Sequence, residues 1–98
     1  MNKPQTDRFE SVWDAIADTP EETANLRVRS ELMDKISELI AANGRTPVEA
    51  AAQCGLTYPR ISDLLRRRIS RFSLDSLVKI AVALGQRVHV RLEAAQAQ

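Results

Sequence analysis

Two helix starts that lie eleven residues apart, with a glycine between them, constrain the fold of this chain more than any other feature. The first is Thr46-Pro47-Val48-Glu49, where threonine can cap a helix, proline suits the first turn and glutamate completes a capping box. Gly55 then ends the helix, because glycine readily adopts the positive φ of a tight turn. The second start follows at Thr57-Tyr58-Pro59. The spacing predicts a helix-turn-helix over residues 46–65, with its second helix continuing to about Arg67.

Small and apolar side chains occur where such a motif needs them. Ala51 lies at the expected closest approach of the two helices, and Gly55 follows four residues later. Further apolar residues can fix the angle between the helices, namely Ala50, Cys54, Leu56, Ile61 and Leu64. The second helix then keeps a polar outer face. Because an α-helix fits the major groove, where each base pair shows a distinct donor and acceptor pattern, this face is a candidate for DNA recognition.

Helical patterns also flank the motif on both sides. A short amphipathic helix is expected over residues 9–18, and a longer one over residues 19–43, followed by the capping glycine Gly44. After a loop over residues 68–72, a last helix is expected over residues 73–85, with a serine cap and a terminal glycine. Together with the motif, these patterns predict five helices and an all-α fold.

The end of the chain changes to a strand pattern. Polar and apolar residues alternate in Arg87-Val88-His89-Val90-Arg91-Leu92, and residues 93–98 look like a frayed tail. A lone strand needs a partner for its backbone groups, so we expect it to pair with a second copy of the chain or with another protein. A disordered or helical tail is the alternative. The predicted units are residues 1–22 (tail and short helix), 23–86 (helix-turn-helix domain) and 87–98 (strand and tail). The candidate interface residues are Val88, Val90, Leu92, Phe9 and Trp13.

Composition narrows the classes of function. A chain of 98 residues suits one small domain, and its only cysteine, Cys54, excludes an internal disulfide or a CxxC metal pair. No apolar run approaches the roughly 18 residues of a membrane span, and no secretory signal is visible, so a cytoplasmic location is expected. His89 has no metal-ligand partners, and no Ser/His/Asp set or carboxylate pair is visible. We expect neither an enzyme nor a metal or other cofactor.

The net charge of +1 conceals an asymmetry between the two halves of the chain. Residues 1–40 hold nine acidic and five basic residues, whereas residues 41–98 hold four acidic and nine basic ones. Because a run of arginines directly follows the second helix of the motif, phosphate binding is favoured over a merely solvated surface. If four or five arginines contact phosphates, the slope of log K against log salt should be near −4 per protomer. The expected phosphate contacts are Arg45, Thr46, Arg66, Arg67, Arg68 and Arg71.

From Thr46 to Gly85 the sequence TPVEAAAQCGLTYPRISDLLRRRISRFSLDSLVKIAVALG resembles the helix-turn-helix domains of the Cro/phage-repressor, or XRE, type. With FESVWDAIADTPEETANLRVRSELMDKISELI before it and RVHVRLE after it, the wider pattern is similar to HigA-like antitoxins and small transcriptional regulators. The resemblance implies a lambda-repressor-like fold. In this motif the first residues of the second helix reach the bases, and Arg60 can read guanine or bind phosphate. The implied base contacts are Tyr58, Pro59, Arg60, Ser62 and Asp63.

The resemblance also implies a homodimeric, sequence-specific repressor that binds a palindromic operator in double-stranded DNA. In the HigA-like branch, the partner would be a basic toxin of the RelE/HigB type. Pro47 and Tyr58 depart from the family, since many relatives carry glutamine at both positions. These departures leave two alternatives open. One is a stand-alone XRE-type regulator without a toxin, and the other is a protein-interaction module with a vestigial DNA surface.

Overall fold

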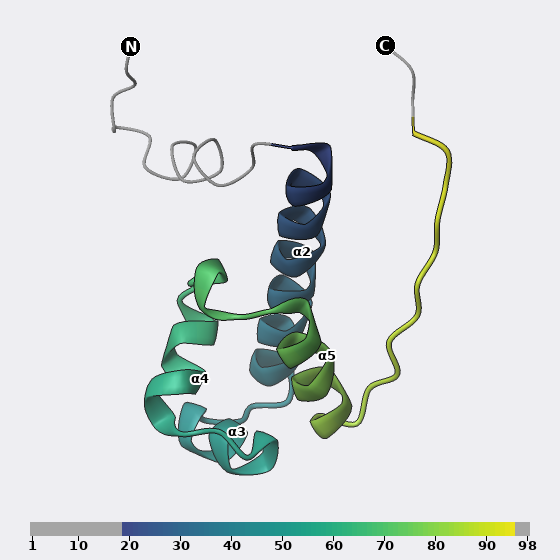
Figure 1. The fold of residues 1–98 in the computed structure, drawn as a ribbon. Helices are drawn as coiled ribbons and strands as arrows, with labels where there is room; N and C mark the ends of the chain where they lie inside the picture. The colour runs from purple at the N-terminus through teal and green to yellow at the C-terminus, as the bar shows by residue number, and fades with distance from the viewer. Residues whose placement is uncertain (1–18, 96–98) are drawn as a thin grey trace, which may run out of the picture.

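The computed structural model describes residues 19–95, and the helix predicted over residues 9–18 lies outside the described residues. The described part of the chain contains four α-helices, one 3-10 helix and no strand. Figure 1 shows α2 as the long helix beside which the others lie. The elements are α2 (Pro20–Ala42), α3 (Pro47–Cys54), α4 (Tyr58–Leu65), η1 (Ile69–Arg71) and α5 (Leu74–Ala83). None of these helices is both long and apolar enough to cross a membrane.

All four α-helices begin with a hydroxyl cap. The side chains of Thr19, Thr46, Thr57 and Ser73 each accept a hydrogen bond from the backbone N–H three residues later, at 3.0–3.2 Å. At α3 the capping box is complete, because the backbone N–H of Thr46 also donates to Glu49 Oε1 at 2.9 Å. These caps confirm the predicted helix starts and satisfy N–H groups that have no partner within their own helix.

The four described α-helices also end alike, and this shared ending explains why the predicted end of α4 was wrong. After each helix one residue has a positive φ, and the next N–H donates to the carbonyl oxygen five residues earlier. Three of these residues are glycines, but after α4 the residue is Arg67, with φ 58°. The prediction that α4 continues to Arg67 is therefore wrong, since the helix ends at Leu65. The predicted loop over residues 68–72 contains the 3-10 turn η1.

The core joins the helix-turn-helix to the rest of the molecule. Ile61 and Leu64 of α4 are completely buried, as is Ala50 of α3, and Ala51 is 5% exposed. They share one cluster with residues of α2, of α5 and of the loop between α4 and α5, namely Met33, Ile36, Ile40, Phe72, Leu77, Ile80, Ala81 and Leu84. Burying each large apolar side chain contributes about 1.5–3 kcal/mol. The cluster therefore holds the inner face of α4 in place, so the orientation of its outer face is fixed.

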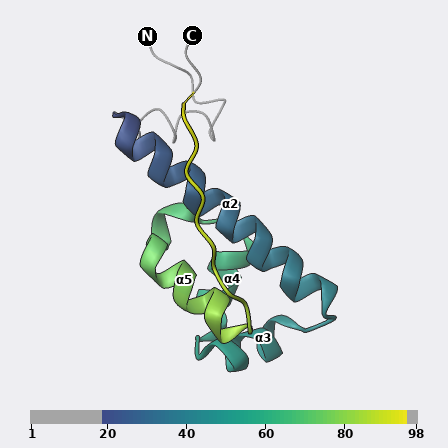
Figure 2. The ribbon, with the colours of Figure 1, turned by 90° about the vertical axis from the view of Figure 1, so that its right-hand side faces the viewer.

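The C-terminal segment, residues 86–95, is extended but forms no strand in the described chain. Figures 1 and 2 show that it leaves the end of α5 and runs back in the direction of the N-terminal end of α2. Val88 is half-buried against the core, whereas Val90 and Leu92 are 83% and 91% exposed. The strand predicted over residues 87–92 is thus not formed, because no described segment pairs with it. Its pairing with another chain stays a prediction.

Candidate nucleic-acid interface

The outer face of α4 is open to solvent at its N-terminal end. Ile61 and Leu64 turn the opposite face of this helix into the core, and Thr57 caps its first turn. Tyr58 is 55% exposed, Pro59 is exposed and Ser62 is half-buried. Three of the five predicted base contacts therefore lie together on an accessible helix face.

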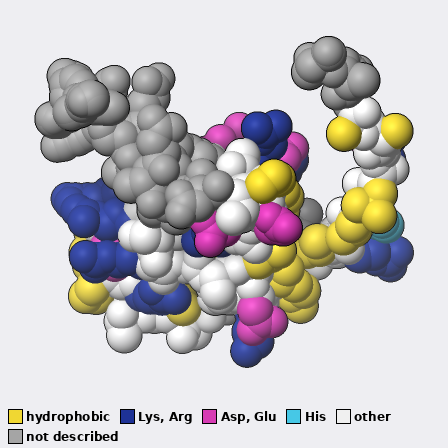
Figure 3. All heavy atoms as spheres, turned by 45° about the horizontal axis from the view of Figure 1, so that its top comes forward, with side chains coloured by type: hydrophobic (Ala, Val, Ile, Leu, Met, Phe, Trp, Pro, Cys, Tyr) yellow, Lys and Arg dark blue, Asp and Glu magenta, His cyan; other side chains and the backbone are white. Residues whose placement is uncertain are grey.

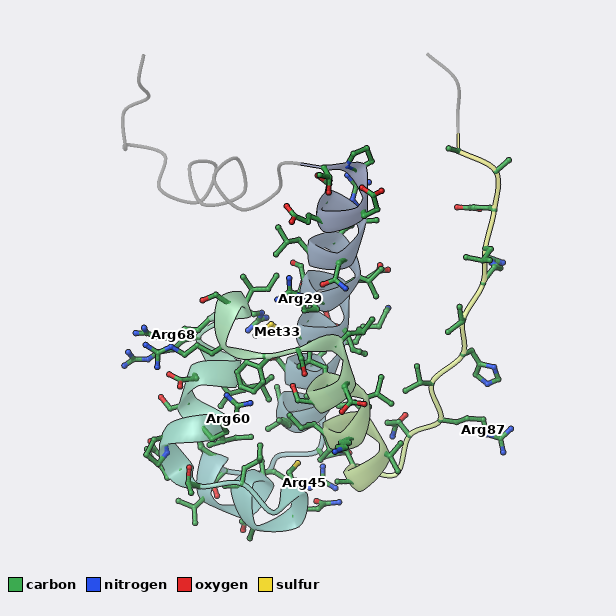
Figure 4. All side chains as sticks on the ribbon, viewed as in Figure 1. Arg29, Met33, Arg45, Arg60, Arg68 and Arg87 are labelled. Atoms are coloured by element: carbon green, nitrogen blue, oxygen red, sulfur yellow. The ribbon has the colours of Figure 1, made fainter. Side chains whose placement is uncertain are left out.

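Arg60 points the other way, toward its own protein. Its guanidinium carbon lies 4.0 Å from the centroid of the Phe72 ring, and its Nη1 donates to the carbonyl oxygen of Arg71 at 2.7 Å. Figure 4 shows Arg60 on the side of α4 that faces the rest of the molecule. Stacking on an aromatic ring and a short hydrogen bond both hold this side chain in place. In the free protein, Arg60 is occupied within the fold rather than presented to a base or a phosphate.

Asp63, also a predicted base contact, is surrounded by arginines. Its two carboxylate oxygens form separate ion pairs, Oδ1 with Arg68 Nε at 3.5 Å and Oδ2 with Arg71 Nη1 at 3.3 Å. The Asp63 side chain is 21% exposed, whereas the two arginines are 44% and 55% exposed. The carboxylate thus lies beneath two outward-lying cations.

The predicted phosphate contacts divide into two groups. Arg66, Arg68 and Arg71 are exposed, and Arg66 has no ion-pair or hydrogen-bond partner for its side chain among the described residues. Arg67 is exposed to a similar degree, at 46%, but it folds back onto α2, where its Nε donates to Asp34 Oδ1 at 2.7 Å, and its Nη1 donates to the carbonyl oxygen of Leu65. Figure 3 shows Lys and Arg side chains gathered at the left side of the molecule, and Figure 4 labels Arg68 at that side.

Two further phosphate contacts, Arg45 and Thr46, are predicted at the start of α3. Arg45 is half-buried, and its Nη1 is enclosed without a hydrogen-bond partner among the described residues. The hydroxyl of Thr46 is exposed but serves as the cap of α3. The cationic surface beside α4 therefore consists of Arg66, Arg68 and Arg71, which we call the basic loop.

A family model described as a helix-turn-helix domain matches residues 15–93. The chain belongs to this helix-turn-helix family. Membership indicates a DNA-binding regulator, and domains of this kind typically carry no enzymatic activity. The match is to the helix-turn-helix domain as a class and does not distinguish antitoxins from other regulators. In a comparison with curated proteins, no sequence matched the chain.

Arg29, for which the sequence predicted no role, connects α2 to the loop that follows α4. Arg29 of α2 donates through Nη1 to the carbonyl oxygens of Ile69 and Phe72, both at 3.1 Å, and through Nε to Asn25 Oδ1 at 2.6 Å. It thereby fixes both ends of η1. No local pattern reveals this role, because its partners lie about forty residues away and are backbone atoms.

Cys54 belongs to the packing of the domain, as predicted. The thiol is half-buried against the core, and burial raises its pKa above the ordinary value, although the nearby positive charge of Arg45 opposes this shift. A thiol with a raised pKa is mostly neutral at physiological pH and therefore poorly reactive. Within residues 19–95, no group of three His, Cys, Asp or Glu side chains is placed to hold a metal ion.

Proposed function

We propose that this helix-turn-helix protein is a dimeric, sequence-specific repressor of transcription. We further propose that it is the antitoxin of a type II toxin–antitoxin pair, which represses its own operon and neutralises a basic RelE/HigB-like toxin. The observation that carries the proposal is that exposed residues at the start of α4 and the exposed arginines of the basic loop lie on one short stretch of chain, residues 58–71. This stretch combines groups that can read base edges with cations that can bind phosphates.

Base recognition is assigned to the accessible residues of α4. Pro59 and the Tyr58 ring offer apolar contact to a thymine methyl group, whereas the hydroxyls of Tyr58 and Ser62 can bond to base edges. Arg60 and Asp63 are left out of the readout, because their side chains are engaged within the protein. Phosphate contacts are assigned to Arg66, Arg68 and Arg71, which would orient α4 in the groove.

Dimerisation is assigned to the C-terminal segment. Residues 87–92 are already extended and carry Val90 and Leu92 almost fully exposed, so pairing of two such segments would bury apolar side chains and satisfy backbone groups. A symmetric dimer would place two α4 helices about one helical turn, roughly 34 Å, apart on a palindromic operator.

The dimer is tested by changing one face of this segment. Since Val90 is 83% exposed in the single chain, Val90→Asp should leave the fold intact and yield a monomer by sedimentation equilibrium. His89→Asp, which places the same charge on the neighbouring position of the alternation, is the control and should remain dimeric. A monomeric mass for the wild-type protein would refute this part of the proposal.

The toxin partner is supported by the charge of α2. The exposed acidic residues of this helix outnumber its basic ones, which suits a basic protein electrostatically. Phe9 and Trp13, the other candidates for partner contact, lie outside the described residues. Co-expression with the product of a short adjacent reading frame that encodes a basic RelE-like protein should yield a stable complex. If no complex forms and the toxin is not neutralised, the protein is instead a stand-alone regulator of transcription.

DNA recognition is tested by fluorescence anisotropy with the DNA upstream of the protein's own gene. The wild type should bind this duplex more tightly than a scrambled duplex at low salt. Tyr58→Ala, a change at an exposed position, should weaken specific binding by about 1–3 kcal/mol and leave scrambled binding nearly unchanged. An absence of wild-type binding to either duplex would refute the proposal.

A further inference from the structure

The side chain of Asp63 links α4 to the side chains of the basic loop. Each of its carboxylate oxygens pairs with a different arginine, Arg68 at 3.5 Å and Arg71 at 3.3 Å. The Arg68 backbone N–H also donates to the Asp63 carbonyl oxygen at 3.0 Å. The two guanidinium groups therefore both pair with one carboxylate on α4.

The backbone of the same loop is held from two sides. Arg29 of α2 bonds to the carbonyl oxygens of Ile69 and Phe72, and Arg60 of α4 bonds to that of Arg71. The side chains of Arg68 and Arg71 thus project from a fixed backbone, and the Asp63 carboxylate limits their remaining rotamer freedom. An ordered pair of cations loses less conformational entropy when it binds a phosphate.

The burial of the three groups indicates how they meet a ligand. Asp63 is 21% exposed and lies beneath the arginines, which are about half exposed. A guanidinium group has five N–H donors, and the ion pairs use one nitrogen of each arginine. Donors remain on the solvent side, so a phosphate can bind there while the carboxylate keeps its own contacts.

We propose that Asp63 is a positioning residue that preorganises Arg68 and Arg71 as a clamp for one phosphodiester group of the DNA backbone. This inference rests on the proposed DNA binding and gives Asp63 a role other than base reading. It predicts a change in DNA affinity opposite in direction to the one expected from charge alone. Removal of a negative charge beside DNA should strengthen binding by simple electrostatics, whereas loss of the clamp should weaken it.

The test is the affinity of Asp63→Asn for a random-sequence duplex, measured by anisotropy. The expected result is a roughly threefold to tenfold weaker affinity than wild type, because two disordered arginines must be ordered on binding. In an Arg68→Gln/Arg71→Gln background, Asp63→Asn should cause no further loss. Asp75→Asn, which removes the same charge from an exposed pair with Lys79 on α5, is the control and should cause no loss.

A second measurement uses only the wild-type protein. Relaxation of the Nε–H groups by nuclear magnetic resonance should show Arg68 and Arg71 ordered in the free protein and Arg66 mobile. The proposal is overturned if all three are equally mobile, if Asp63→Asn binds as tightly as wild type or tighter, or if its loss persists without the two arginines. Failure of the wild type to bind any duplex would refute the proposed function itself and this inference with it.

Discussion

The two adjacent arginines at the end of α4 should contribute differently to DNA binding. Arg66 is exposed and has no side-chain partner among the described residues, whereas Arg67 is bonded to Asp34 and to the carbonyl oxygen of Leu65. Each phosphate contact contributes about −0.9 to the slope of log K against log salt. With Arg66 on one phosphate and Arg68 and Arg71 together on a second, the wild-type slope should be about −1.8 per protomer, rather than the −4 expected from the sequence.

Substitution by glutamine removes each charge and keeps much of the side-chain length. Arg66→Gln should reduce the slope to about −0.9, so affinity would fall about 3.5-fold between 50 and 200 mM salt instead of about 12-fold. Arg67→Gln should keep the wild-type slope of about −1.8. Anisotropy titrations at four or five salt concentrations distinguish these values. Equal slopes for both variants, or a reduced slope for Arg67→Gln alone, would refute this assignment of the cations.

Three further predictions concern the fold and the cysteine. Ile61→Ala should lower the free energy of unfolding by about 2–5 kcal/mol in urea titrations, because this side chain is completely buried; a loss below 1 kcal/mol would contradict the packing. Gly55→Ala and Gly44→Ala should each cost about 1–2 kcal/mol, since both glycines have φ 68° with open space around the added carbon, and unequal costs would argue against a purely backbone effect. Alkylation of Cys54 should be slower than that of a free thiol at pH 8, with its rate midpoint at higher pH, because its pKa is raised; equal rates would contradict the burial.

The helix-turn-helix could be predicted from the sequence because its signals are local. Caps at Thr46 and Thr57, the turn glycine Gly55 and the apolar residues Ile61 and Leu64 each occupy a position defined by helix geometry. The end of α4 was predicted too late, because the residue with a positive φ after this helix is Arg67 and not a glycine that the sequence would reveal. A strand at residues 87–92 could not be predicted reliably, because a strand forms only with a partner and no segment of residues 19–95 pairs with this one.

The roles of the arginines could not be predicted, because composition does not show where a side chain turns. Arg66 and Arg67 had the same predicted role, yet Arg67 is paired with Asp34, whereas Arg66 has no side-chain partner among residues 19–95; Arg60, predicted to contact a base, stacks on Phe72. These differences arise from contacts between distant segments. The same is true of Arg29, whose partners are carbonyl groups of the loop that carries the basic residues.

Whether α4 and the basic loop form the DNA-binding surface can be measured by mapping amide chemical shifts during titration with a duplex. We expect the largest changes at residues 57–63 and 66–71, with little change along α2 or residues 87–92 beyond those of dimer formation. Changes concentrated on α2 or on the C-terminal segment, with α4 unaffected, would contradict this expectation.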